Sequence, residues 1–211
     1  MSATHCISYI PNAFTSDFLD QCHTYCRTQI DYIAEGDHDL PRHQKWLQED
    51  GGYFDPLWNT RHPRWTASLY EDDLSAIQSH LDVVSKQHLA KISFSAPTDF
   101  NSCLINLYRN GGDSIKRHAD TASPFGRMPT VAILSLGETR TMHFYRRDTT
   151  VTNPRSLKTR DDHFSIHLEH GSLLIMAGTT QIDYLHEIPK EPHVEGSRYS
   201  MTFRHYTRGV K

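Results

Sequence analysis

The sequence predicts an α+β, mainly β protein in which a β-sandwich or jelly roll follows two N-terminal helices. From about Cys103 onward, apolar and polar residues alternate in seven or eight short segments separated by turn-forming residues. Two upstream segments have helical apolar spacing. A chain of 211 residues can form one well-packed core, and no linker or repeat divides it. We therefore expect one domain over 1–211, with the helices in 1–99 and the jelly roll in 100–206.

The first helix is expected near the N-terminus. Residues 5–10 form a short apolar segment, and Pro11 and Asn12 end it. Asn12 or Ser16 can cap a helix that continues to about Ile30, with aromatic and apolar residues along one side.

A polar segment separates the two helices. Residues 35–62 are rich in Gly, Asp and His, and we interpret them as a long loop or irregular hairpin. Loops of this length are usually functional or mobile. Its aromatic residues either contact a substrate or pack onto the core. The second helix is expected from Asp72 or Asp73 to about Lys91.

The C-terminal half contains the strands. They are expected near 102–109, 115–118, 130–136, 140–147, 163–169, 172–177, 182–187 and 197–206. The polar segment 148–162 is expected to be an exposed hairpin loop.

Composition limits the possible classes of protein. The net charge of -3 excludes a polycationic nucleic-acid binder, so any phosphate contact needs a local patch. No segment has the length and hydropathy of a membrane span or a secretion signal, and we expect an intracellular monomer. The four cysteines do not suggest a disulfide framework. Cys22 and Cys26 are more consistent with structural thiols than with a metal site, because no second pair completes one.

A candidate metal site begins at His118-Ala119-Asp120. Residues two apart on a strand project from the same face, so His118 and Asp120 can point at one ion. A third ligand must come from elsewhere, and His186 is the best candidate. Two His and one carboxylate on one side of a metal are typical of non-heme Fe(II) oxygenases. In a chain with 15 His, one such tripeptide alone could arise by chance.

Further motifs surround this tripeptide. They are Asn106-Leu107-Tyr108-Arg109-Asn110-Gly111, Ser135-Leu136-Gly137, His170-Gly171, Thr180-Gln181-x-Asp183 and Arg198-Tyr199-Ser200-Met201-Thr202-Phe203-Arg204. Over about Pro63 to Tyr206 their order and spacing resemble the AlkB family of 2-oxoglutarate- and iron-dependent dioxygenases. They are most similar to the eukaryotic AlkB homologues that act on alkylated single-stranded DNA or RNA.

The resemblance implies a double-stranded β-helix, which is a jelly roll, with the N-terminal helices on one face and a substrate-recognition lid. The lid would begin at Pro63-Arg64-Trp65-Thr66-Ala67. It also implies Fe(II) as the bound metal, with 2-oxoglutarate and O2 as cosubstrates.

The cosubstrate needs cationic and polar partners. Arg198 is the candidate for the far carboxylate, because a guanidinium matches a carboxylate with two hydrogen bonds. Arg204 lies on the same strand face and matches a second arginine of the family, next to the iron. Asn106 and Tyr108 match the hydrogen-bonding residues of the family. Ser200 stands where the family has Asn.

The implied reaction is oxidative removal of an alkyl group from a base nitrogen, with release of formaldehyde. Candidate substrate-contacting residues are Arg64, Trp65, Lys116, Arg117, Ala122 and Asp183. Ala122 departs from the family, whose base-repair members usually carry an acidic residue there. The departure bears on which base is read.

Three functions stay open. The first is a nucleic-acid dealkylase, and the second is an oxygenase of the same fold that hydroxylates a small molecule or a protein side chain. The third is a catalytically silent interaction domain. The complete triad and both arginines argue against the third. A basic lid would favour the first over the second, and residues 35–65 are not clearly basic.

Overall fold

The computed structural model describes residues 4–30, 40–50, 52–53, 66–148 and 158–207. Within these ranges, eight strands form a large sheet in the order β1-β10-β7-β12-β5-β2-β4-β3, and four form a small sheet in the order β6-β11-β8-β9. The strands are β1 (His5–Ile10), β2 (His43–Gln48), β3 (Gly52–Tyr53), β4 (Thr66–Leu69), β5 (Ser102–Tyr108), β6 (Ile115–His118), β7 (Val131–Gly137), β8 (Arg140–Arg147), β9 (Thr159–Leu168), β10 (Leu173–Gly178), β11 (Tyr184–Ile188) and β12 (Arg198–Arg204). The helices are α1 (Ser16–Ile30), α2 (Asp72–Lys91), α3 (Ala122–Phe125) and α4 (Thr180–Asp183).

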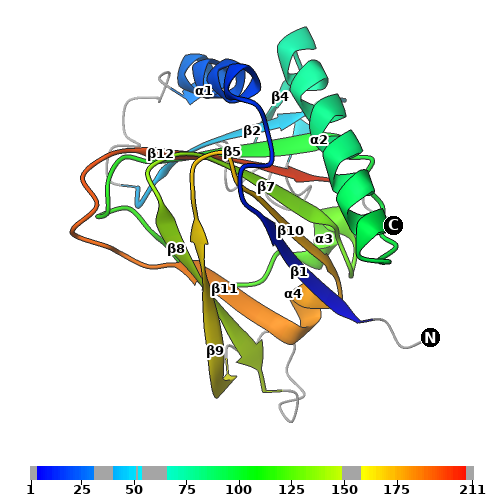
Figure 1. The fold of residues 1–211 in the computed structure, drawn as a ribbon, viewed down its shortest axis with the longest axis vertical. Coiled ribbons are helices and arrows are strands. Elements are labelled where there is room, and N and C mark those ends of the chain that lie inside the picture. The colour runs from blue at the N-terminus through cyan, green and yellow to red at the C-terminus, as the bar shows by residue number, and fades with distance from the viewer. Residues whose placement is uncertain (1–3, 31–39, 51, 54–65, 149–157, 208–211) are drawn as a thin grey trace.

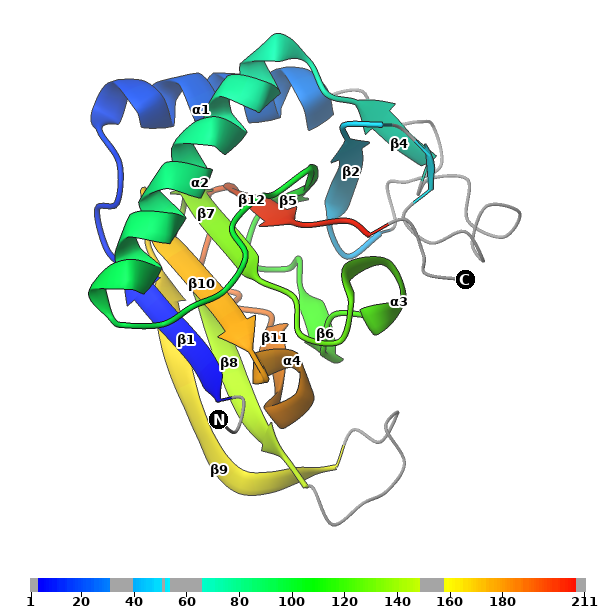
Figure 2. The same ribbon diagram turned by 90° about the vertical axis from the view of Figure 1, so that its right-hand side faces the viewer.

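The two long helices lie against the outer face of the large sheet (Figure 1). Their apolar sides join the inward residues of that face in one buried cluster, which includes Leu19 and Leu81. Figure 2 shows α1 and α2 crossing above the sheet, with the small sheet on its other side. The expected helices and their place on one face are confirmed. No helix among the described residues is long and apolar enough to cross a membrane.

The interpretation of 35–62 as a loop is wrong for its central part. His43–Gln48 forms β2, which is hydrogen-bonded to β5 over its whole length. Its residues are mostly polar on both faces, and this concealed the strand: Gln44 lines a polar pocket, and His43 and Lys45 are on the other face. Trp46 is 1% exposed and packs edge-on against Phe125. Residues 35–39 and 54–62 lie outside the described residues.

The other expected strands correspond to β5–β12. The expected loop 148–162 is shorter than predicted, because β9 begins at Thr159 and continues the hairpin with β8. Residues 149–157 lie outside the described residues. The region before residue 100 also adds β1 next to β10 and β4 next to β2.

The turn between β5 and β6 is held by charged side chains. Arg109 donates to both carboxylate oxygens of Asp113, at 2.8 and 2.7 Å. The buried Arg140 donates to carbonyls of the same turn and to Glu191. A Cβ at Gly111 would overlap the carbonyl oxygen of Glu191, so this position requires glycine. The turn therefore fixes where β6 starts, and with it the position of His118.

Candidate metal and cosubstrate site

A pocket of about 230 Å³ lies between the two sheets. Strands β2, β5, β7, β10 and β12 of the large sheet contribute residues to one side of the pocket, its floor, and β6, β8 and β11 of the small sheet contribute residues to the other. Its polar lining residues are Arg42, Gln44, Asn106, Tyr108, His118, Asp120, Thr121, His186, Arg198, Ser200, Thr202 and Arg204. Apolar residues such as Ile133 and Met176 fill the space between them.

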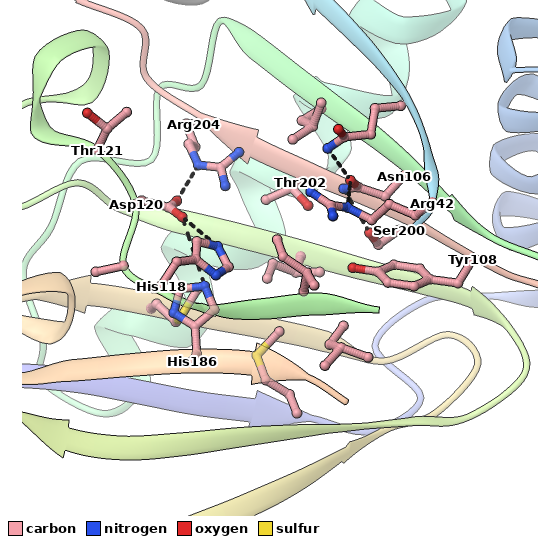
Figure 3. Close-up of a pocket in the computed structure, with 18 of the residues that line it drawn as sticks. Arg42, Asn106, Tyr108, His118, Asp120, Thr121, His186, Ser200, Thr202 and Arg204 are labelled. Atoms are coloured by element: carbon pink, nitrogen blue, oxygen red, sulfur yellow. Dashed lines mark hydrogen bonds and ion pairs between the residues drawn. The ribbon is translucent and has the colours of Figure 1, made fainter. Parts of the chain in front are cut away.

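The three expected metal ligands meet at one end of this pocket (Figure 3). His118 and His186 are opposite each other on the paired strands β6 and β11. Asp120 Oδ1 lies 3.8 Å from His118 Nε2 and 3.9 Å from His186 Nε2. One ligand atom from each residue falls within 4.8 Å of the others. The strand spacing and the cross-strand register together produce this geometry.

Asp120 is held in place from two sides. Arg204 Nε donates to Asp120 Oδ2 at 2.6 Å, which leaves Oδ1 facing the histidines. The backbone N–H of Asp120 donates to Gln181 Oε1 at 2.9 Å. Burial alone would raise the pKa of Asp120, but Arg204, His186 and His118 outweigh it and lower the pKa to about 2. The carboxylate is therefore ionised and available to a cation.

Both histidines are neutral at physiological pH. Burial, assisted by neighbouring His118, lowers the pKa of His186 to about 3. Burial also lowers the pKa of His118. His118 Nδ1 donates to the carbonyl of Lys116 at 2.8 Å, so the proton is on Nδ1 and Nε2 keeps a free lone pair. Two neutral imidazoles and one carboxylate match the ligand set of a facial Fe(II) site.

Two arginines bring buried donors to the same pocket. Arg198 is 1% exposed, and its NH2 donates to Ser135 Oγ at 2.9 Å. Within the part of the chain that the structure describes, its Nε and NH1 have no partner, and neither does Arg204 NH1. Burial lowers the pKa of Arg198 to about 10. Because buried donors without partners are costly, this arrangement fits an anionic ligand with carboxylates.

The remaining cosubstrate candidates lie on the pocket floor. Asn106 and Ser200 are opposite each other on β5 and β12, and Asn106 Nδ2 donates to Ser200 Oγ at 3.4 Å. The ring of Tyr108 lies 5.3 Å from the guanidinium carbon of Arg198. The structure thus brings together all the residues expected for the metal and the cosubstrate.

The expected substrate contacts are placed differently. Lys116 is exposed, and Arg117 stacks on the Tyr145 ring at 3.5 Å, on the opposite face of the small sheet from the metal site. Asp183, the last residue of α4, accepts a hydrogen bond from the hydroxyl of Thr179, which precedes the helix. Ala122 is exposed at the start of α3.

None of these four described residues lines the pocket. Arg64 and Trp65 lie outside the described residues.

Sequence reasoning missed several lining residues. Thr121, next to Ala122, borders the pocket. Gln44 on β2 and Arg42, the residue just before β2, border it as well. The signal for Thr121 was its position directly after the metal-binding Asp120. No sequence motif marked Arg42 or Gln44, and their segment was interpreted as a loop.

A two-sheet fold whose pocket combines two histidines, one carboxylate and two buried arginines is the arrangement expected of a jelly-roll oxygenase. Residues 3–204 match the family described as the 2OG-Fe(II) oxygenase superfamily, and the chain belongs to it. This membership confirms the mainly β jelly-roll class. Membership also implies Fe(II) as the cofactor and 2-oxoglutarate and O2 as cosubstrates. The two histidines and the carboxylate fit the metal, and the buried arginines fit the carboxylates of 2-oxoglutarate.

Named relatives support the resemblance to AlkB-type dioxygenases. The alpha-ketoglutarate-dependent dioxygenase alkB homolog 3 of Homo sapiens is 44% identical over 105 residues, covering 50% of this chain and 36% of that protein. The DNA oxidative demethylase ALKBH2 of Arabidopsis thaliana is 33% identical over 145 residues, covering 63% of this chain and 44% of that protein. The chain thus spans less than half the length of these relatives.

Solved structures confirm the fold. The structure of OsALKBH1 superimposes with a TM-score of 0.64 at 17% identity, covering 94% of this chain and 97% of that one. A Pseudomonas putida prolyl-4-hydroxylase superimposes with a TM-score of 0.60 at 15% identity, covering 98% and 95%. At such identities the likeness shows the fold alone.

Proposed function

We propose that this chain is an Fe(II)- and 2-oxoglutarate-dependent oxygenase that removes alkyl groups from base nitrogens of DNA or RNA, with a preference for single strands. One observation carries the oxygenase assignment: three potential metal ligands and two buried arginines with unused donors open into one pocket. The names of the partial relatives, a DNA oxidative demethylase among them, support the choice of nucleic acid.

Each residue has a defined task in this proposal. His118, Asp120 and His186 hold the metal through neutral nitrogens and one carboxylate oxygen. Arg204 keeps Asp120 ionised and correctly oriented. Arg198, deep in the pocket, holds the far carboxylate of 2-oxoglutarate. When bound, iron and 2-oxoglutarate would supply the oxidation of the alkyl carbon with dioxygen, and a hydroxylated methyl group would then leave the base nitrogen as formaldehyde.

The preference for single strands follows from energetics. Extracting a base from a duplex costs a few kcal/mol, which an unpaired base does not require. The net charge of -3 gives the whole chain no general attraction for a duplex that would offset this cost. A single strand can instead present its alkylated base directly to the pocket.

The test is an assay of formaldehyde and succinate release with single-stranded oligonucleotides carrying methylated adenine or methylated cytosine. Matched unmethylated strands, matched duplexes and a reaction without 2-oxoglutarate are the controls. We expect release with the methylated single strands and less with the duplexes. A marked duplex preference would contradict the strand assignment. No activity on any alkylated nucleic acid, with succinate release on a small molecule or protein, would instead establish the second candidate function.

A further inference from the structure

The amide of Asn106, on the pocket floor, is oriented by one side chain of the neighbouring strand β2 and one from the residue just before it. Arg42 Nε donates to Asn106 Oδ1 at 3.0 Å, and Gln44 Nε2 donates to the same oxygen at 2.9 Å. In Figure 3 Arg42, Asn106 and Ser200 lie close together on the floor, away from the metal ligands. Asn106 is 6% exposed, so its donors and acceptors depend on these neighbours.

The strand register explains the grouping. Gln44 is opposite Asn106 on β2 and β5, and Asn106 is opposite Ser200 on β5 and β12. Directly opposed residues of antiparallel strands project from the same face of the sheet. The three side chains therefore form one row across the pocket floor, with Arg42 beside it.

This row permits only one orientation of the Asn106 amide. An arginine nitrogen can donate a hydrogen bond but cannot accept one, so the atom facing Arg42 must be the oxygen of Asn106. The nitrogen is then directed to the other side, where it donates to Ser200 Oγ at 3.4 Å. This long hydrogen bond leaves the N–H group available to a ligand in the pocket.

We propose that Arg42 and Gln44 are positioning residues for the anionic cosubstrate: they hold the Asn106 amide with its N–H group towards the carboxylate of 2-oxoglutarate. The inference rests on the proposed cosubstrate role of Asn106. With the amide reversed, a carbonyl oxygen would face the carboxylate, and two acceptors would repel each other. Replacing Arg42 or Gln44 with a side chain that cannot donate, or that only accepts, therefore weakens 2-oxoglutarate binding and leaves the metal ligands unchanged.

The segment that carries Arg42 is itself fixed to the site. Arg42 NH1 donates to the carbonyl of Ser114 at 3.3 Å, and Ser114 N–H donates to the carbonyl of Pro41 at 2.9 Å. Ser114 immediately precedes β6, which carries His118. The start of β2 is thus tied both to the cosubstrate floor and to the strand that carries a metal ligand.

Two substitutions of Gln44 separate orientation from simple packing. Gln44→Met removes one donor and leaves Arg42 to hold the amide, so 2-oxoglutarate should bind roughly 3-fold more weakly. Gln44→Glu offers only acceptors and favours the reversed amide, so binding should weaken by about 10-fold or more. Glu is closer to Gln in shape than Met is. A purely structural role would therefore make Gln44→Glu the milder change.

The readout is the dissociation constant of 2-oxoglutarate, measured by calorimetry on protein loaded with redox-inert Mn(II). Arg42→Met is the second variant, with an expected loss of roughly 3- to 10-fold. Lys45→Met and Lys45→Glu are matched controls. They place the same new side chains on the same strand, but on the helix-facing side, where Lys45 is opposite Ile105. They should bind 2-oxoglutarate as the wild type does.

The outcomes are distinguishable. If Gln44→Glu binds 2-oxoglutarate as tightly as Gln44→Met, while Mn(II) affinity is unchanged in both, the positioning role is refuted. If the wild type itself does not bind 2-oxoglutarate, the cosubstrate assignment of the pocket fails first. A loss of Mn(II) binding in the Gln44 variants would also overturn the inference, because it would show general damage to the site.

Discussion

The two faces of strands β5 and β12 are equally buried but chemically opposite. The face towards the helices carries Cys103, Ile105, Leu107, Tyr199, Met201 and Phe203, and the face towards the pocket carries Ser102, Leu104, Asn106, Tyr108, Arg198, Ser200, Thr202 and Arg204. All these residues alternate along the same two strands. The helix face packs against apolar side chains of α1 and α2 in one buried cluster and carries no buried cation among the described residues of β5 and β12. The pocket face contains buried cations whose donors are not all used.

Within this one pair of strands, the helix face therefore serves stability and the pocket face serves ligand binding. A buried charge without a full set of partners lowers the free energy of unfolding, whereas a buried apolar side chain raises it. The pocket face therefore costs stability until a ligand with carboxylates completes it. We expect substitutions on the helix face to alter the free energy of unfolding, and those on the pocket face to alter ligand affinity.

Arg198→Met should produce the largest effect. The substitution removes the buried partner of a carboxylate, which costs about 3–5 kcal/mol of binding, or a loss in 2-oxoglutarate affinity of more than 100-fold. The ligand-free protein should be at least as stable as the wild type, because a costly buried cation is gone. Calorimetry on the Mn(II)-loaded protein and urea unfolding measure the two quantities. Unchanged cosubstrate affinity would rule out the role given to Arg198.

Met201→Ala is the opposite test, on the helix face of the same strand. Met201 is fully buried in the cluster with α1 and α2. Truncation should lower the free energy of unfolding by about 2–5 kcal/mol, from lost burial and the cavity left behind. The 2-oxoglutarate affinity of the folded protein should stay within about twofold of wild type, measured well below the unfolding midpoint. A large loss of affinity would show that the two faces are coupled.

Ligand binding should stabilise the protein through the pocket face alone. At a 2-oxoglutarate concentration 100 times its dissociation constant, the Mn(II)-loaded wild type should gain about 2.7 kcal/mol of unfolding free energy. Met201→Ala should gain the same amount from its lower starting point. Arg198→Met should gain almost nothing at that concentration. An equal gain in all three proteins would mean that the ligand binds somewhere else.

The metal ligands and the arginines could be predicted from sequence because their spacing is local. His118 and Asp120 are two residues apart on one strand, and Arg198 and Arg204 share one face of β12. His186 required the motifs around it, since only the register of β11 with β6 brings it to His118.

The role of β2 could not be predicted in this way. Its pocket-facing residue Gln44 contacts Asn106, which is 62 positions away in the chain. A polar strand that borders a polar pocket has the composition of a loop, so periodicity did not distinguish the two. The substrate candidates Lys116 and Arg117 were chosen for adjacency in sequence. Strand geometry turns Arg117 to the face opposite His118.

The smallest predicted effect concerns Asp82, a carboxyl group on α2 that departs from the apolar character of the helix face. Burial, with smaller contributions from Asp99 and Glu49, raises the pKa of Asp82 to about 6, although the Phe100 N–H donates to its carboxylate and acts in the opposite direction. A carboxyl with a raised folded-state pKa contributes stability below its unfolded pKa, near 3.8, and loses that contribution as the pH rises through about 6.

Asp82→Asn removes this titration without changing the shape of the side chain. The stability of the variant relative to wild type should therefore rise between pH 4 and pH 7, by about 1 kcal/mol after allowance for partial solvent screening. Urea unfolding of both proteins across this range measures the difference, and 2-oxoglutarate affinity at pH 7 should be the same in both. A pH-independent difference would mean that Asp82 titrates normally. In that case the helix face would tolerate a charge at no cost, and the contrast between the two faces would not extend beyond the strands to the helices that cover them.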